Sequence, residues 1–127
     1  MREITSHQIN ECNQAIAIQA DDPDPKNGNA SHDYTITIHH PGSPDLAATT
    51  STLVRFQHGP IKEVGTNGIT QEVLLAILID RLEGFQSGPY ACPENADALE
   101  HLRRATERLH DRTKARVQRG VEGTHTV

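Results

Sequence analysis

Aromatic side chains are scarce in this chain of 127 residues, which has two Phe, two Tyr and no Trp. Hydrophobic residues of all kinds reach 35%. A chain this short and this poor in large apolar side chains builds only a modest core by itself. We therefore expect one domain, residues 1–127, whose core is completed by other copies of the chain. The alternative is a marginally stable monomer.

Cysteines and long apolar runs are also few. Cys12 and Cys92 lie far apart and form no Cys-x-x-Cys pair, so neither a disulfide framework nor a zinc site is expected. The longest apolar run, Val73–Ile79, is too short to span a bilayer, and the N-terminus has no long apolar run. These absences predict a protein of a reducing cytoplasm that makes no contact with a membrane.

Positive charge is scarce overall but concentrated in one stretch. The net charge is -5 at pH 7, which argues against general binding of DNA or RNA. Residues 103–119 are nevertheless basic, and arginines recur there at every fourth residue: Arg104, Arg108, Arg112 and Arg116. On a helix these residues form one stripe, and their planar guanidinium groups suit a phosphate. The alternative is a solvated face interleaved with Glu107 and Asp111.

Residues 1–69 predict a small antiparallel sheet with loops. Alternating β-branched and apolar residues predict strands over three segments: Ala15–Ala20, Tyr34–His39 and Thr52–Gln57. We also expect Ile61–Val64 to pair briefly as a strand. Pro, Asp, Asn and Gly dominate residues 21–31, which predicts a solvated loop with no packed element. Residues 41–50 predict a turn-rich link, and nothing definite is predicted for residues 1–13.

Residues 70–127 predict a helical hairpin followed by a tail. Thr70 suits the N-cap of a helix over Gln71–Gln86. Pro93 suits the first turn of a second helix that runs to about Arg119, where Gly120 ends it. The fold class is therefore α+β, with a small N-terminal antiparallel β-sheet followed by a C-terminal αα-hairpin. The first helix is apolar on most sides, which again predicts a homo-oligomer.

The joint between the two helices carries the clearest binding candidates. Phe85 lies near the end of the first helix, and Asn95 lies in the first turn of the second. Phe85 is either an apolar plug of the hairpin or a stacking platform for a base. Asn95 is either a local hydrogen-bonding residue or a reader of a base or ribose edge. Together, beside a cationic helix, they predict recognition of a base and a phosphate.

No motif predicts catalysis, and no cofactor is expected. The sequence contains no G-x-S-x-G, no H-E-x-x-H and no Walker loop. His39 and His40 are adjacent in a strand and point to opposite faces, so they cannot chelate one ion together. His101 and His110 lie roughly on opposite faces of a helix. We therefore expect a non-enzyme without catalytic residues and without a metal site.

The order and spacing of five segments are distinctive: Phe56–Gly65, Asn67–Thr70, Phe85–Pro89, Glu94-Asn95 and Arg119–His125. In these segments the chain resembles phage and prophage proteins of the anti-Thoeris sponge family, which shares a helical-hairpin domain with phage anti-CBASS sponges. The resemblance covers most of the chain. It is strongest from Phe56 to the C-terminus and weaker over the N-terminal sheet.

The resemblance implies a phage-encoded, non-catalytic protein that acts in the cytoplasm of the infected bacterial host. Such sponges bind the cyclic nucleotide messengers of bacterial defence and hold them intact, so that the effector is never triggered. The implied partners are the glycosylic cyclic ADP-ribose isomer of Thoeris and, as in some members, cyclic di- or trinucleotides of CBASS. The family assembles as dimers or as hexamers built from dimers.

The resemblance also assigns ligand-binding roles by matching motif and spacing. To the matched positions we add two tail residues, because the tail must pack near a subunit interface. The resulting set is Phe85, Asn95, Arg112, Arg116, Arg55, Thr124 and His125. Three rival functions stay open: a sponge for CBASS cyclic oligonucleotides alone, an oligomerising structural or regulatory phage protein without nucleotide binding, and an enzyme that degrades the messenger.

Overall fold

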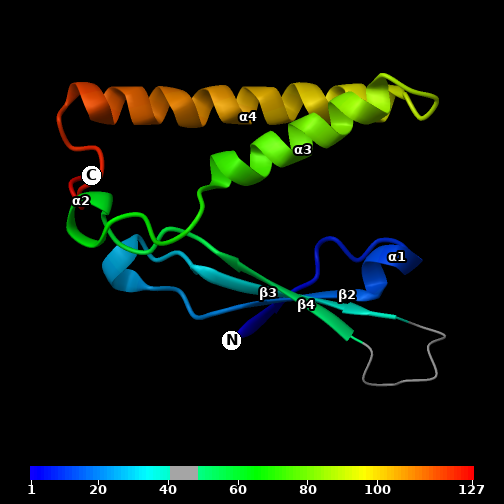
Figure 1. Cartoon of the computed structure of the whole chain (residues 1–127), viewed down its shortest axis with the longest axis horizontal. Helices are drawn as coiled ribbons and strands as arrows, with labels where there is room; N and C mark the ends of the chain where they lie inside the picture. The colour runs from blue at the N-terminus through cyan, green and yellow to red at the C-terminus, as the bar shows by residue number, and fades with distance from the viewer. Residues whose placement is uncertain (41–48) are drawn as a thin grey trace. The chain divides into compact units, whose positions relative to one another are not determined.

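The computed structural model describes residues 1–40 and 49–127. They form an α+β fold in which an antiparallel sheet precedes a pair of packed helices (Figure 1). This confirms the predicted fold class. The chain divides into two compact units, each described by itself. The sheet unit is Met1–Gly59 with Thr66–Ile69, and the hairpin unit is Pro60–Gly65 with Thr70–Val127.

The sheet is a meander in which each strand pairs with the next one along the chain. Its strands are β1 (Arg2–Ile4), β2 (Ile16–Ala20), β3 (Asp33–His39) and β4 (Thr49–Arg55). Ile18 pairs with Ile36 across β2 and β3, and Tyr34 pairs with Val54 across β3 and β4. The rings of Tyr34 and Phe56 meet edge to face, with 5.6 Å between centroids. This aromatic contact holds the chain leaving β4 against β3.

Residues 21–31 are not the loop without a packed element that their composition predicts. A short 3₁₀ turn, η1 (Pro25–Asn27), begins after Asp24, whose carboxylate accepts from the Lys26 N–H at 3.0 Å. Asp24 also forms a backbone bridge with Ala30. Ser31 and His32, which follow, are only 6% and 7% exposed. The Asx cap on the turn and the bridge supply the backbone hydrogen bonds that a solvated loop would give to water.

One other prediction for the sheet unit needs correction, and the structure adds elements where none was predicted. β4 begins at Thr49, so the end of the expected 41–50 link is strand, while residues 41–48 lie outside the described residues. The first residues, for which nothing definite was predicted, form β1 and a short helix, α1 (Glu11–Gln14). β1 is only three residues long and depends on distant pairing with β2, which local composition does not reveal.

The hairpin unit matches the predicted helix boundaries closely. It contains α3 (Gln71–Gln86) and the longer α4 (Pro93–Gln118), which pack against each other. Gly120, at a φ of 71°, ends the second helix in the left-handed conformation that glycine adopts readily. The strand expected at Ile61–Val64 is wrong. This segment is the one-turn helix α2, because Val64 N–H and Gly65 N–H donate back to the carbonyls of Pro60 and Ile61.

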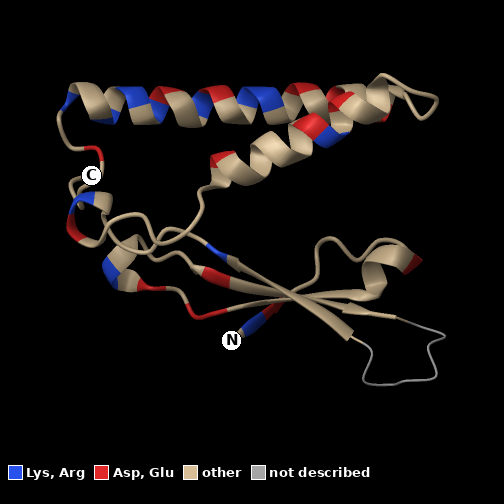
Figure 2. Ribbon diagram, in the orientation of Figure 1, with Lys and Arg blue, Asp and Glu red and all other residues tan. Residues whose placement is uncertain are grey.

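The apolar core is small. Among the described residues, only Ala20 and Leu99 are buried hydrophobic residues. α3 exposes Val73, Ile77 and Leu78 at 43%, 58% and 46% of their surfaces. Figure 2 shows a long uncharged stretch between the charged positions at the start and in the second half of α3, whereas basic and acidic positions alternate along α4. Within residues 1–40 and 49–127, none of the helices has the length and hydrophobicity that crossing a membrane requires.

Candidate functional site

Phe85 is half-buried in the last turn of α3, and two side chains of the hairpin tip contact its ring. The guanidinium carbon of Arg81 lies 5.0 Å from the ring centroid, and the ring of Tyr90 meets it edge to face at 6.2 Å. Tyr90 is 73% exposed. An aromatic pair with a cation over one ring suits contact with both a base and a phosphate. Sequence reasoning missed Arg81 and Tyr90, although the i, i+4 spacing of Arg81 and Phe85 was readable.

Asn95 stands on the other side of the same turn, in the first turn of α4. The N–H of Cys92, the N-cap of α4, donates to Oε1 of Gln86 at 3.1 Å. This bond ties the end of α3 to the start of α4, so Phe85 and Asn95 flank one short turn. Asn95 is half-buried, and its amide makes no side-chain hydrogen bond within the described residues. Its polar atoms are therefore available to a ligand or a second chain.

Most of the arginine stripe on α4 is interleaved with carboxylates. Arg104 pairs with Glu100 at 2.9 Å, and Arg108 lies 3.7 Å from Asp111. The hydrogen bond and charge of Arg104 lower the pKa of Glu100. Arg112 is exposed and forms no ion pair in the part of the chain that the structure describes. It is the member of the stripe best placed to receive an anion.

Arg116 is directed to the C-terminal tail. Its side chain is only 12% exposed, and its Nε donates to Oε2 of Glu122 at 3.0 Å. The two Nη atoms donate to three backbone carbonyls, those of Thr126 at 2.7 Å, Val121 at 2.9 Å and Thr124 at 3.1 Å. The planar, charged guanidinium of Arg116 therefore holds the tail through several hydrogen bonds at once. The predicted role of Arg116 in ligand binding stays a prediction.

The tail closes on α2 in the same unit. Lys62 N–H donates to the carbonyl of Gly123 at 3.1 Å, and Nδ1 of His125 lies 3.7 Å from Oε2 of Glu63. Thr124 is half-buried, and its hydroxyl donates to the carbonyl of Val121. Thr124 and His125 therefore lie near the Arg116 end of α4. Their ligand-binding roles also stay predictions.

Six of the seven predicted site residues fall at two ends of the hairpin unit. Along α4, Asn95 and Arg112 are separated by about 25 Å at 1.5 Å per residue. One chain therefore cannot place Phe85 and Asn95 against the same small ligand as Arg112 and Arg116. Arg55, the remaining candidate, lies in the sheet unit, where its Nε donates to Oδ1 of Asp33 at 3.2 Å across β3 and β4.

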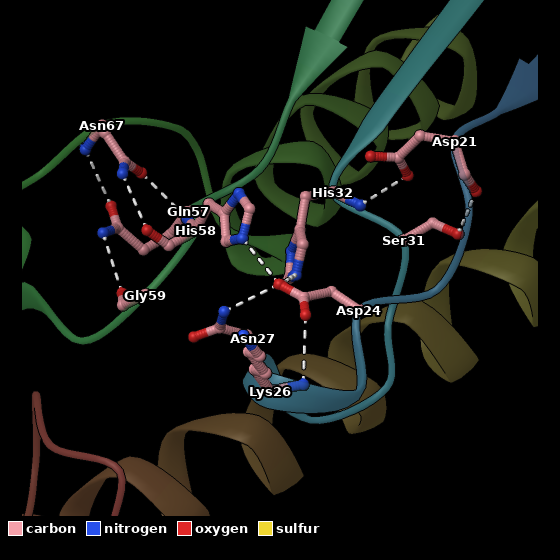
Figure 3. A network of polar contacts seen from close by, with 10 residues as sticks. All are labelled: Asp21, Asp24, Lys26, Asn27, Ser31, His32, Gln57, His58, Gly59 and Asn67. Atoms are coloured by element: carbon pink, nitrogen blue, oxygen red, sulfur yellow. Dashed lines mark hydrogen bonds and ion pairs between the residues drawn. The ribbon is translucent and has the colours of Figure 1, made fainter.

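A polar cluster that sequence reasoning missed lies in the sheet unit (Figure 3). We call Asp24, His32 and His58 the imidazole cluster. Nε2 of His58 lies 2.7 Å from Oδ2 of Asp24, and Nε2 of His32 lies 3.8 Å from the same oxygen. The two imidazole rings stack with 4.2 Å between centroids and 18° between planes. These residues are distant in sequence, so no local motif brings them together.

The carboxylate of this cluster is held ionised by its hydrogen bonds. Nδ2 of Asn27 donates to Oδ2 of Asp24 at 2.7 Å, and this contact, followed by that of His58, lowers the pKa of Asp24 to about 2. The N–H of Lys26 contributes a further bond to Oδ1. Asp24 is therefore an anionic acceptor throughout the neutral pH range.

The fold and the tip define an α+β protein with a C-terminal helical hairpin, whose tip carries an aromatic pair and a cation. Residues 50–114 match the hairpin domain of the Acb2/Tad1 family, and the chain belongs to that family. It is also similar to a protein of Bacillus phage SBSphiJ7 called Thoeris anti-defense 1, with 48% identity over 81 residues. The match covers 64% of this chain and 56% of that relative, so the chain spans little more than half the relative's length. These findings confirm the family resemblance read from the sequence.

Proposed function

We propose that this protein is a phage-encoded sponge that binds cyclic nucleotide immune messengers without catalysis and so blocks bacterial anti-phage defence. Its first ligand is the glycosylic cyclic ADP-ribose isomer of Thoeris, and its further ligands are CBASS cyclic di- or trinucleotides. It acts in the cytoplasm of the infected host. One observation carries the proposal: an aromatic pair with a cation over one ring stands at the hairpin tip beside an available amide. The name of the phage relative, Thoeris anti-defense 1, supports it.

In this proposal two copies of the chain share each pocket. The separation of about 25 Å between Asn95 and Arg112 requires a second hairpin, running in the opposite direction, to bring an arginine end to a tip. The exposed apolar residues Val73, Ile77 and Leu78 on α3 supply a surface for that pairing. A dimer, or a hexamer built from dimers, follows from this arrangement.

The residues of the pocket then divide the ligand between them. Phe85 stacks on adenine, and the amide of Asn95 hydrogen-bonds the base or ribose. Arg112 of the second copy pairs with a phosphate of the ligand. It is exposed and not engaged by a carboxylate in the described part of the chain. Arg116, Thr124, His125 and Arg55 complete the proposed set.

We expect Phe85→Ala to raise the Kd for the cyclic ADP-ribose isomer roughly 5- to 150-fold, since base stacking is worth about 1–3 kcal/mol. Titration calorimetry with the cyclic ADP-ribose isomers and with cyclic di- and trinucleotides measures this effect. Phe85→Leu is the matched control, because leucine keeps an apolar plug but has no ring face. The stacking role predicts that both variants lose affinity. Absence of binding by the unaltered protein to every one of these ligands contradicts the proposal.

Self-association has its own test. We expect Ile77→Glu, which puts a charge on a residue that is 58% exposed, to shift the protein to a monomer in light scattering coupled to size exclusion. His110→Glu places the same charge on an exposed position of α4 and should leave the mass unchanged. If the unaltered protein has the mass of a monomer, the proposal of a pocket shared by two copies is wrong.

The second candidate is an oligomerising structural or regulatory phage protein. The exposed face of α3 and the internal pairing of Arg104 and Arg108 favour it. It predicts that Ile77→Glu changes assembly while no nucleotide binds to any variant. A messenger-degrading enzyme predicts that the ligand recovered after denaturation is altered, whereas a sponge returns it intact.

A further inference from the structure

The imidazole cluster contains a buried nitrogen without a partner. The side chain of His32 is 8% exposed, and its Nε2 makes no hydrogen bond in the described residues. The nearest charged oxygen, Oδ2 of Asp24, is 3.8 Å away. Leaving such a buried polar atom unpaired costs free energy, so it calls for an explanation. In Figure 3 both imidazoles converge on the Asp24 carboxylate.

The ligand atoms of the cluster have a spacing close to that of a metal site. The three atoms, one from each of Asp24, His32 and His58, all lie within 4.8 Å of one another. Tetrahedral Zn²⁺ with bonds of about 2.0–2.1 Å keeps its ligand atoms roughly 3.3 Å apart. The distances from Oδ2 of Asp24, 2.7 Å to His58 and 3.8 Å to His32, lie on either side of that value. Because the two rings are stacked only 18° from parallel, the imidazoles must also rotate so that their in-plane lone pairs meet at one ion.

Hydrogen bonds fix the main chain at both histidines of the cluster. The N–H of His32 donates to Oδ1 of Asp21 at 3.0 Å, and its carbonyl accepts from Phe56 N–H at 2.8 Å. Asn67 holds the backbone of His58 through two hydrogen bonds of 2.8 Å. The N–H of His58 donates to Oδ1 of Asn67, and Nδ2 of Asn67 donates to the carbonyl of His58. These bonds hold the two backbone segments that carry the imidazoles next to each other.

We propose that Asp24, His32 and His58 form a Zn²⁺ site in the sheet unit. Two neutral imidazoles and one carboxylate are a ligand set that Zn²⁺ accepts, with the fourth position left to water. The ion takes the lone pair of His32 Nε2 and replaces the contact between His58 and Asp24. Asn27 keeps its bond to the carboxylate and orients it. The site joins the turn before β3 to the chain that leaves β4, so the bound ion holds these two segments together.

The test uses the whole protein, stripped of metal with a chelator and then desalted. Zn²⁺ titration calorimetry should give one ion per chain, and saturating Zn²⁺ should raise the unfolding temperature by roughly 4–8 °C. Co²⁺ should produce the visible absorption bands of a site with nitrogen and oxygen ligands. His32→Gln and His58→Gln should each weaken Zn²⁺ binding at least tenfold.

Two controls separate this site from other donors. His39→Gln removes an exposed histidine from the end of β3 and should leave Zn²⁺ affinity unchanged. His58 is half-exposed, so His58→Gln keeps the fold and remains informative even if His32→Gln does not fold. Absence of Zn²⁺ binding by the unaltered protein overturns the proposal. So does unchanged binding by a folded His58→Gln variant, because the ion would then be held by a thiol or by other histidines.

Discussion

Gly68→Ala is expected to lower the free energy of unfolding of the sheet unit by about 3–5 kcal/mol. A Cβ on Gly68 would lie 2.4 Å from the carbonyl carbon of Phe56 and 2.7 Å from the nitrogen of Gln57. These are backbone atoms, so they cannot rotate away as a side chain can. The strands would have to part where Gln57 N–H donates to Ile69 O and Ile69 N–H donates to Arg55 O. Denaturant titration followed by circular dichroism measures the loss.

The matched control is Gly84→Ala. Gly84 lies within α3, and a Cβ there would meet nothing within 4 Å. Alanine in a helix interior is more favourable than glycine, so this variant should gain about 0.5–1 kcal/mol. Amide exchange should show lost protection in β3 and β4 for Gly68→Ala alone. A loss below 1 kcal/mol for that variant would mean that the chain segments at Phe56 and Gly68 separate easily.

The hairpin could be read from the sequence because its signals are local. Thr70, Pro93 and Gly120 mark helix ends through backbone preferences that act within one turn. The structure begins α3 and α4, and ends α4, where these residues predict. Even here the mechanism differs at Thr70, which holds the N-cap position without a side-chain hydrogen bond. The sheet was readable where strands alternate, as at β3, and unreadable at β1, which depends on pairing with β2.

The features that sequence reasoning missed depend on contacts between distant residues. His32 and His58 are brought together by β3 and β4, and Asp24 reaches them from a turn that composition alone describes as solvated. Ile61–Val64 begins and ends with β-branched residues, which favours a strand. Its backbone hydrogen bonds are nevertheless made one turn along the same segment, so the segment needs no neighbouring strand. Within the candidate site, the placement of Phe85 and Asn95 on either side of one turn could be predicted, because the turn residues between them are recognisable in the sequence. The contacts of Arg116 with the tail could not be anticipated, because helix periodicity treats all members of the stripe alike.

Arg116→Ala is expected to release the C-terminal tail and to cost roughly 2–4 kcal/mol, since charge-assisted bonds to Glu122 and to three carbonyls are lost together. The carbonyls at Val121 and Thr124 would be left without this donor beside a half-buried segment. Amide exchange over residues 120–127, together with thermal unfolding, measures the effect. Arg116→Lys should recover only part of the loss, because an ammonium group cannot reproduce the fork.

Arg112→Ala is the matched control for this prediction, because it removes the same side chain from an exposed position one helical turn away. Its effect on stability should stay within about 0.5 kcal/mol. If the proposed function is correct, Arg112→Ala nevertheless weakens binding of the cyclic ADP-ribose isomer without loosening the tail. Arg116→Ala then weakens binding only together with lost protection of the tail. If the tail of Arg116→Ala keeps its amide protection, the structural role of this arginine is wrong, and only its proposed role in ligand binding is left.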